Sequence, residues 1–73
     1  MEKFLKNFAD QLDNTDINTL SPQTKFRDID EWSSLTALSV IAMVDEEYDV
    51  VLKGDDMQKA QTIEDIFNII LSK

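Results

Sequence analysis

The feature that most restricts the fold is the spacing of the apolar residues, which recur every three or four positions in separate segments of the chain. Such spacing places apolar side chains on one side of an α-helix. No segment alternates apolar and polar residues over the length of a strand. The chain is therefore predicted to be all-α. The pattern is clearest near the end, in Ile63, Ile66, Phe67, Ile70 and Leu71.

The first helix is predicted to run from Glu2 to Leu12. After it, turn-forming side chains interrupt the apolar spacing, and a connection of about 20 residues extends from Asp13 to Ser33. Its isolated apolar residues indicate a connection that is ordered and held against the core, with short turns of helix possible within it. These apolar residues are Ile17, Leu20, Phe26 and Ile29.

The second helix is predicted to open at Ser33-Ser34-Leu35 and to end at about Tyr48. Ser33 is the expected N-cap, because a serine hydroxyl accepts a hydrogen bond from a free amide of the first helical turn. So small a domain can hardly bury apolar residues all around one helix, so we expect a core helix with a partly exposed apolar strip. One side of the helical wheel contains Leu35, Leu38, Ile41, Ala42 and Tyr48. The other side adds Val40, Met43 and Val44.

Two further helices are predicted after Gly54. The segment from Asp55 to Ala60 has the length of a short third helix. Thr62 then begins a last helix that runs to the C-terminus, with Thr62 as N-cap and Asp65 three positions later. The expected architecture is a small four-helix bundle of three long helices and one short helix, with a long crossover between the first and second, in a single domain spanning residues 1–73.

The composition excludes several kinds of chemistry. The 73 residues include no His and no Cys, which removes imidazole bases, thiol nucleophiles, disulfides and metal centres built on those ligands. The formal charge of −8 opposes contact with nucleic acids and anionic membranes and favours basic protein partners.

Location and assembly are predicted from what the sequence lacks. The longest apolar runs, from Val40 to Val44 and from Ile69 to Leu71, are far shorter than the roughly 20 residues that cross a bilayer. The first residues do not have the basic-then-apolar pattern of a signal sequence. We expect a cytoplasmic protein, without membrane insertion, that is a monomer.

The abundant carboxylates do not form a recognisable catalytic or metal-binding pattern. A glycosidase needs two carboxyl groups across a cleft, and no spacing singles out such a pair. Asp45, Glu47 and Asp49 alternate as in a calcium loop, but Val50 stands where an EF-hand requires Gly. A hydrolase that uses these carboxylates is therefore a remote alternative, and we expect no catalytic residues and no metal site.

The acidic end of the second helix has two interpretations. Asp45, Glu46, Glu47 and Asp49 oppose the partial negative charge at a helix C-terminus and repel one another. One interpretation is a solvated acidic end that serves solubility. The other is a docking surface for basic residues of partner proteins.

The segment from Trp32 to Val50 resembles the central helix of acyl carrier proteins. That family has Asp-Ser-Leu, then an apolar helix, then an acidic end closed by an aromatic residue; this chain reads Ser-Ser-Leu, an apolar helix and Asp-Glu-Glu-Tyr. The resemblance extends over the opening helix, the loop with Phe26 and Ile29, the short acidic third helix and the last helix that begins at Thr62.

The resemblance implies a non-catalytic carrier. Ser34 would be the attachment point of a 4′-phosphopantetheine arm, taken from coenzyme A, whose thiol holds acyl groups as thioesters. The partners would be a phosphopantetheinyl transferase and the acyl-processing enzymes of fatty-acid or specialised (polyketide, lipid or aminoacyl) biosynthesis.

The resemblance also implies different roles for the residues of the second helix. Ile41 would line the space that receives an acyl chain. Val40, Val44 and Tyr48 would face the core. The residues expected to meet partner enzymes through their basic patches are Leu35, Ala42, Asp45, Glu46, Asp55 and Asp56.

Two positions depart from the family pattern. Ser33 replaces the Asp that precedes the modified serine and helps to recruit the transferase and its metal ion, and Ser39 stands where many members have Glu. The loss of that Asp leaves open an alternative, namely an unmodified carrier-like module that binds a basic protein partner.

Overall fold

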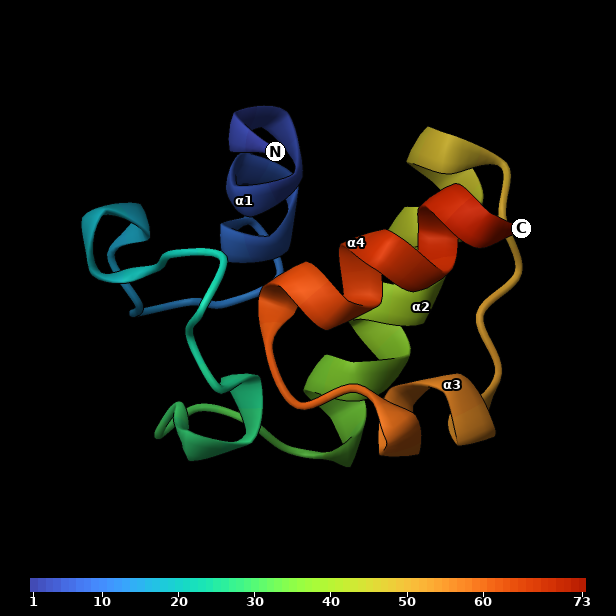
Figure 1. Ribbon diagram of the computed structural model, residues 1–73. Helices are drawn as coiled ribbons and strands as arrows, with labels where there is room; N and C mark the ends of the chain where they lie inside the picture. The colour runs from blue at the N-terminus through green and yellow to red at the C-terminus, as the bar shows by residue number, and fades with distance from the viewer.

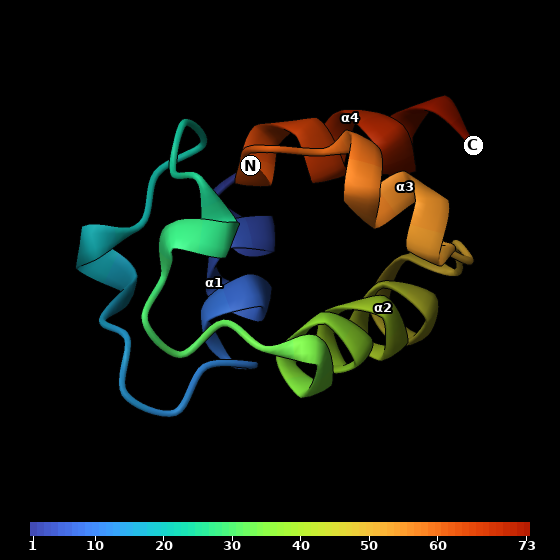
Figure 2. The same cartoon turned by 90° about the horizontal axis from the view of Figure 1, so that it is seen from below.

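The computed structural model describes residues 1–73 as a bundle of four α-helices without a β-strand, which confirms the predicted fold (Figure 1). The helices are α1 (Glu2–Ala9), α2 (Ser34–Tyr48), α3 (Gly54–Lys59) and α4 (Ile63–Ser72). The connection between α1 and α2 contains two short 3₁₀ helices, η1 (Ile17–Thr19) and η2 (Phe26–Asp28). Seen from below, α2 and α4 lie on opposite sides of the molecule, α3 lies at one end, and the crossover forms the other end outside α1 (Figure 2).

The first helix is shorter than predicted, because α1 ends at Ala9 rather than at Leu12. The backbone amides of Gln11 and Leu12 donate to the carbonyls of Phe8 and Ala9, three residues earlier, at 3.0 and 2.9 Å. This tighter turn replaces the α-helical pattern at the end of the helix. Leu12 is nevertheless buried, so the apolar spacing identified a core residue correctly.

One hydrophobic core joins all four helices and the crossover. Aromatic rings connect its parts: Phe4 lies 5.8 Å from Tyr48 and 5.3 Å from Phe67, measured between ring centroids. The buried hydrophobic residues are Phe4, Phe8, Leu12, Leu20, Phe26, Val40, Met43, Val44, Leu52, Met57, Ala60, Ile63, Ile66 and Ile70.

The apolar stripe of α4 is narrower than its sequence suggests. Ile63, Ile66 and Ile70 are buried, but the side chain of Leu71 is 68% exposed. Leu71 lies about 100° further around the helix than Ile70, in the last turn, and so points away from the core. Leu71 therefore belongs to the apolar spacing of the sequence but not to the buried face of α4.

The long crossover is held against α4 by main-chain hydrogen bonds. The amides of Ile63 and Glu64 donate to the carbonyls of Thr24 and Pro22, at 3.1 and 2.9 Å. The prediction that this segment is held against the core is confirmed, since both Leu20 and Phe26 are buried. Ile17 is the exception among its apolar residues, because it sits on η1 with 39% of its surface exposed.

The start of α4 has the reciprocal cap that its sequence predicts. The Thr62 hydroxyl accepts from the amide of Asp65 at 3.1 Å, and the Asp65 carboxylate accepts from the amides of Thr62 and Gln61 at 3.0 and 2.9 Å. The bond from Gln61, followed by that from Thr62, lowers the pKa of Asp65, since both favour its charged form. The cap thus fixes where α4 begins.

None of the four helices combines the length and the apolar character that crossing a lipid bilayer would require.

Candidate functional site

The first turn of α2 is fixed by Ser33. This residue has an extended backbone, with φ of −153° and ψ of 175°, and its hydroxyl oxygen accepts from the amide of Thr36 at 3.3 Å. The predicted N-cap is therefore confirmed. The Ser33 hydroxyl also lies 3.2 Å from that of Thr36, so it contacts both the amide and the hydroxyl of Thr36.

The hydroxyl of Ser34 has no hydrogen-bond partner within the chain, in contrast to that of Ser33. The side chain of Ser34 is exposed. The backbone amides of Ser34 and Leu35 also lack a partner, because the first residues of a helix have no carbonyl one turn before them. These amides and the helix dipole make this end of α2 suited to an anionic group.

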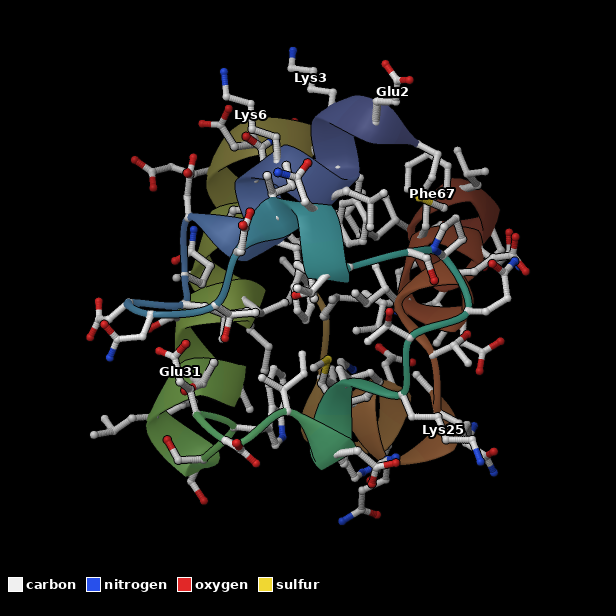
Figure 3. The ribbon with its side chains drawn as sticks, turned by 90° about the vertical axis from the view of Figure 1, so that its left-hand side faces the viewer. Glu2, Lys3, Lys6, Lys25, Glu31 and Phe67 are labelled. Carbon is white, nitrogen blue, oxygen red and sulfur yellow. The ribbon has the colours of Figure 1, made fainter.

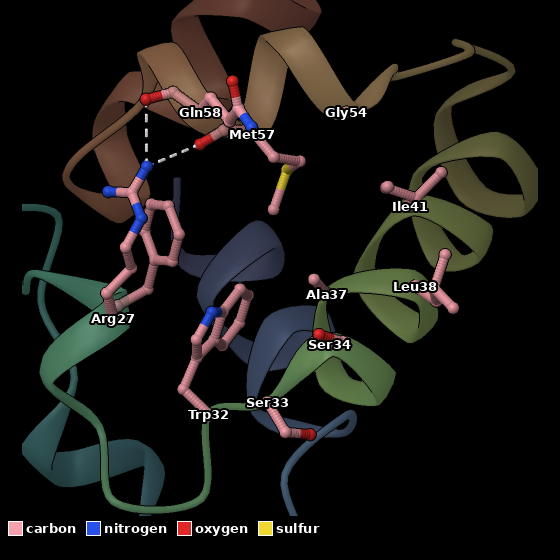
Figure 4. Close-up of a pocket in the computed structure, with 11 residues that line it drawn as sticks. Arg27, Trp32, Ser33, Ser34, Ala37, Leu38, Ile41, Gly54, Met57 and Gln58 are labelled. Carbon is pink, nitrogen blue, oxygen red and sulfur yellow. Dashed lines mark hydrogen bonds between the residues drawn. The ribbon is translucent and has the colours of Figure 1, made fainter.

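Ser34 lies on the wall of an open groove of about 550 Å³ between α2, η2 and α3. Figure 4 shows Met57 of α3 pointing toward Ala37 of α2, with Trp32 and Arg27 on the side of η2. Ile41, the residue expected to border an acyl chain, is part of this wall. The apolar lining consists of Phe26, Trp32, Ala37, Leu38, Ile41 and Met57.

Arg27 connects η2 to the end of α3 beside this groove. Its Nη2 donates to the carbonyls of Met57 and Gln58, at 2.9 and 3.0 Å, and its guanidinium carbon lies 4.9 Å from the centroid of the Phe26 ring. Cations near the last carbonyls of a helix are favourable. No sequence pattern predicts this role, and the one signal is that Arg27 is the only arginine of an acidic chain.

Glu31 is a second residue that the sequence did not reveal. Its carboxylate accepts from the amides of Asp13 and Asn14, at 2.7 and 2.9 Å, and from the hydroxyl of Thr15. The bond from Thr15, followed by that from Asn14, holds the pKa of Glu31 below its ordinary value. Figure 3 shows Glu31 beside the segment that leaves α1. We refer below to Glu31 with these three donors as the Glu31 clamp.

The apolar residues of α2 divide into a buried and an exposed set. Val40 and Val44 are fully buried. Leu35 and Leu38 are 76% and 61% exposed, so the predicted exposed strip is present. The sequence-based grouping of Tyr48 with Leu35 was wrong. Its ring packs against the core instead, as the resemblance implied, and its hydroxyl accepts from Asn7 Nδ2 at 3.3 Å.

Four of the residues predicted to meet partners share the exposed face of α2. Leu35, Ala42, Asp45 and Glu46 are all exposed. The Asp45 and Glu46 carboxylates form neither ion pairs nor hydrogen bonds within the chain. This end of α2 is therefore an unneutralised acidic surface. No group of three or more acidic side chains lies close enough together to hold a metal ion.

The two predicted residues on α3 differ from one another. Asp55 is exposed. Asp56 accepts from the amide of Lys53 at 3.0 Å and forms an ion pair of 3.1 Å with Lys73. The hydrogen bond from Lys53, followed by that from Lys73, lowers the pKa of Asp56. Its carboxylate therefore joins the start of α3 to the end of α4.

Comparison with known protein families gives one match across nearly all of this structure. The family model described as a phosphopantetheine attachment site matches residues 2–70. The match includes all of α1, α2 and α3, the groove, and most of α4.

Proposed function

Because this chain belongs to the phosphopantetheine attachment family of carrier domains, we propose that Ser34 is the residue that bears its 4′-phosphopantetheine arm. Domains of this family are carriers rather than enzymes, and they hold the arm covalently. The chain is thus a phosphopantetheine-carrying protein. The attachment residue, the cargo and the partners are the subject of the proposal.

The observation that carries the assignment is the free hydroxyl of Ser34 at the start of α2. A phosphodiester there lies next to two unpartnered amides and the positive end of the helix dipole. Attachment joins Ser34 Oγ to the phosphorus atom of the pantetheine phosphate, as the bond from that phosphorus to the nucleotide part of coenzyme A breaks and the hydroxyl proton is lost. Ser33 is less suited, because its hydroxyl caps the helix.

The groove beside Ser34 supports a cargo of acyl groups. Bound to Ser34, the arm supplies a thiol that holds an acyl group as a thioester. Ile41 and Met57 offer apolar surface to such a group at opposite sides of the groove. We propose cargo of fatty-acid or specialised biosynthesis, in which this chain delivers intermediates and other proteins perform the chemistry.

We propose that partner enzymes dock on the exposed face of α2. Leu35 and Ala42 offer apolar contact, and Asp45 and Glu46 offer negative charge to basic patches. Asp55 extends the charge onto α3. Asp56 adds its charge beside Asp55, although its Oδ2 atom already accepts from the Lys53 amide and forms the ion pair with Lys73.

Intact-mass measurement tests the attachment residue. The wild-type chain, Ser34→Ala and Ser33→Ala are each incubated with coenzyme A and a phosphopantetheinyl transferase. We expect the wild type and Ser33→Ala to gain the mass of one arm and Ser34→Ala to gain none. Ser33→Ala should also unfold at lower urea concentration, since loss of an N-cap costs about 1 kcal/mol. An arm on Ser34→Ala, or no arm on the wild type with several transferases, contradicts the proposal.

A further inference from the structure

We propose that Glu31 is a positioning residue for transfer of the arm to Ser34, because the Glu31 clamp fixes the short segment that leads into α2. The inference rests on the proposed function of Ser34. It concerns how that serine is presented to the transferase.

The carboxylate of Glu31 joins the start of the crossover to its end. Asp13, Asn14 and Thr15, near the start of the crossover, all donate to Glu31, which lies 16 to 18 residues later in the chain. Two of these donors are backbone amides, which have fixed directions, so the carboxylate is oriented by the main chain. The crossover is thereby closed into a loop whose last residue stands three positions before Ser34.

The backbone of Glu31 is tied to α2 as well. Its carbonyl accepts from the hydroxyl of Thr36 at 3.1 Å. Thr36 is buried, and its amide in turn donates to Ser33. The chain from residue 31 to residue 36 is therefore held at both ends, and Ser34 lies between the two ties.

The residue between the clamp and the serines completes the arrangement. Trp32 stacks on Phe8 with parallel rings and a centroid distance of 5.9 Å, and it lies 4.8 Å from the ring of Phe26. Trp32 is also part of the groove wall beside Ser34. Loss of the clamp removes the side-chain anchor of the residue before Trp32 and leaves only its carbonyl bond to Thr36, so the groove wall and the serine would be held less firmly.

The test breaks the clamp from each side. Glu31→Gln keeps the shape of the side chain but sets an amide group against the donors, and Thr15→Val removes the hydroxyl donor with little change of shape. Asp16→Asn is the matched control, because it also neutralises a carboxylate that accepts a backbone amide in the same loop, that of Asn18 at 2.9 Å, without contact to Glu31. Kinetics of arm transfer are measured for these variants and for Glu31→Gln/Thr15→Val, well below their unfolding temperatures.

We expect Glu31→Gln and Thr15→Val each to lower kcat/KM of arm transfer, Glu31→Gln by about fivefold or more, mainly through kcat, since misplacement of a reacting group slows the reaction step. The double variant should lose no more than Glu31→Gln alone, because both changes break one interaction. Asp16→Asn should keep the wild-type rate. Unchanged kcat in Glu31→Gln, additive losses in the double variant, or an equal loss in Asp16→Asn would overturn the proposal.

Trp32 supplies a readout that does not depend on the arm. It is the only tryptophan, so its emission reports the position of this segment. In the unmodified protein, Glu31→Gln and Thr15→Val should shift that emission to longer wavelength while the helical circular dichroism stays unchanged. No shift, or a shift without loss of transfer rate, overturns the positioning role. A wild-type chain that accepts no arm defeats the proposed function instead, whatever the emission shows.

Discussion

Two neighbouring serines at the start of α2 have different environments although they have the same side chain. Ser33 has an extended backbone and turns its hydroxyl back to the amide of Thr36. Ser34 is the first helical residue, and its hydroxyl is free. The cap could be predicted from the sequence because it joins residues three positions apart. Its consequence is that one serine is occupied by the fold and the next remains available.

Arg27 and Glu31 could not be predicted in the same way. The partners of Arg27 are main-chain carbonyls 30 and 31 residues away, and those of Glu31 are 16 to 18 residues away. Main-chain groups are present at every position, so a sequence gives no sign of which ones a charged side chain will meet. Local bonds can be predicted from residue spacing, whereas these depend on how the crossover packs.

At the residue scale, Asp49 offers a test of backbone strain. It ends α2 with φ of 56° and ψ of 38°, the only positive φ in the chain. A residue with a Cβ atom is strained there, whereas glycine is not, and the carboxylate also opposes the helix dipole. Asp49→Gly should therefore raise the free energy of unfolding by about 1 kcal/mol, measured by urea denaturation. Asp49→Ala, which removes the charge but keeps Cβ, should gain clearly less. An equal gain in both variants would assign the effect to charge alone.

At the scale of elements, α2 is a core helix on one side and an exposed surface on the other. Its bounds and its mixed character could be predicted, because the cap, the apolar residues and the acidic end are all local features. The grouping of Tyr48 with Leu35 was wrong, because Tyr48 follows the buried Val44 by four positions and so lies only about 40° from it around the helix. At α1, the tighter turn after Ala9 left no pattern in the apolar spacing. Leu12 is buried in either geometry.

Charge reversal on α2 tests the docking surface. Asp45→Lys/Glu46→Lys should weaken binding of a basic partner such as the transferase, and the wild-type affinity should fall as salt rises from low to physiological concentration. The same change should leave the domain folded and slightly more stable, since lysine suits a helix C-terminus. Titration calorimetry measures the affinity for the partner, and a thermal unfolding curve measures the stability of the variant.

A matched double reversal on other elements serves as the control. Glu2→Lys/Glu64→Lys changes the net charge equally at exposed positions of α1 and α4. We expect it to retain most of the affinity. If both pairs weaken binding to the same degree, overall charge rather than the face of α2 determines docking.

At the scale of the whole molecule, three carboxylates hold a loop or a helix end in place. Glu31 ties the crossover, Asp56 ties α3 to α4, and Asp65 caps α4. Each has a pKa below its ordinary value of 4.5 for Glu31 or 3.8 for the two aspartates. Their contribution to stability is therefore present above those ordinary values and is lost as the pH falls through the lowered ones.

The effect of pH on Glu31→Gln tests this linkage. At neutral pH the variant should unfold at a lower temperature than the wild type, because the charged clamp is lost. As the pH falls below 4.5, Glu31 itself becomes protonated in the unfolded and then in the folded chain, so the difference should shrink. The difference in unfolding temperature is measured by thermal unfolding of both proteins at constant ionic strength, between neutral and strongly acidic pH. A difference that stays constant would show that the carboxylate charge plays no part.

The overall architecture could be predicted to a large extent, because helix order, the long crossover and most core residues follow from apolar spacing. Of the groove, the family resemblance indicated only Ile41. The walls of the groove come from η2, α2 and α3, and only the packing of Phe26, Ile41 and Met57 brings them together. Which residues line the groove therefore depends on how the chain folds and not on the sequence of any one segment.

The pairing of the crossover with α4 has a consequence for biosynthesis. The carbonyls of Pro22 and Thr24 accept from the amides of Glu64 and Ile63, some 40 residues later in the chain. A ribosome that is making this protein must therefore release almost the whole domain before the crossover can pair with α4. Until then the nascent polypeptide has α1 and α2 without the helix that covers them, and its apolar residues stay open to chaperones.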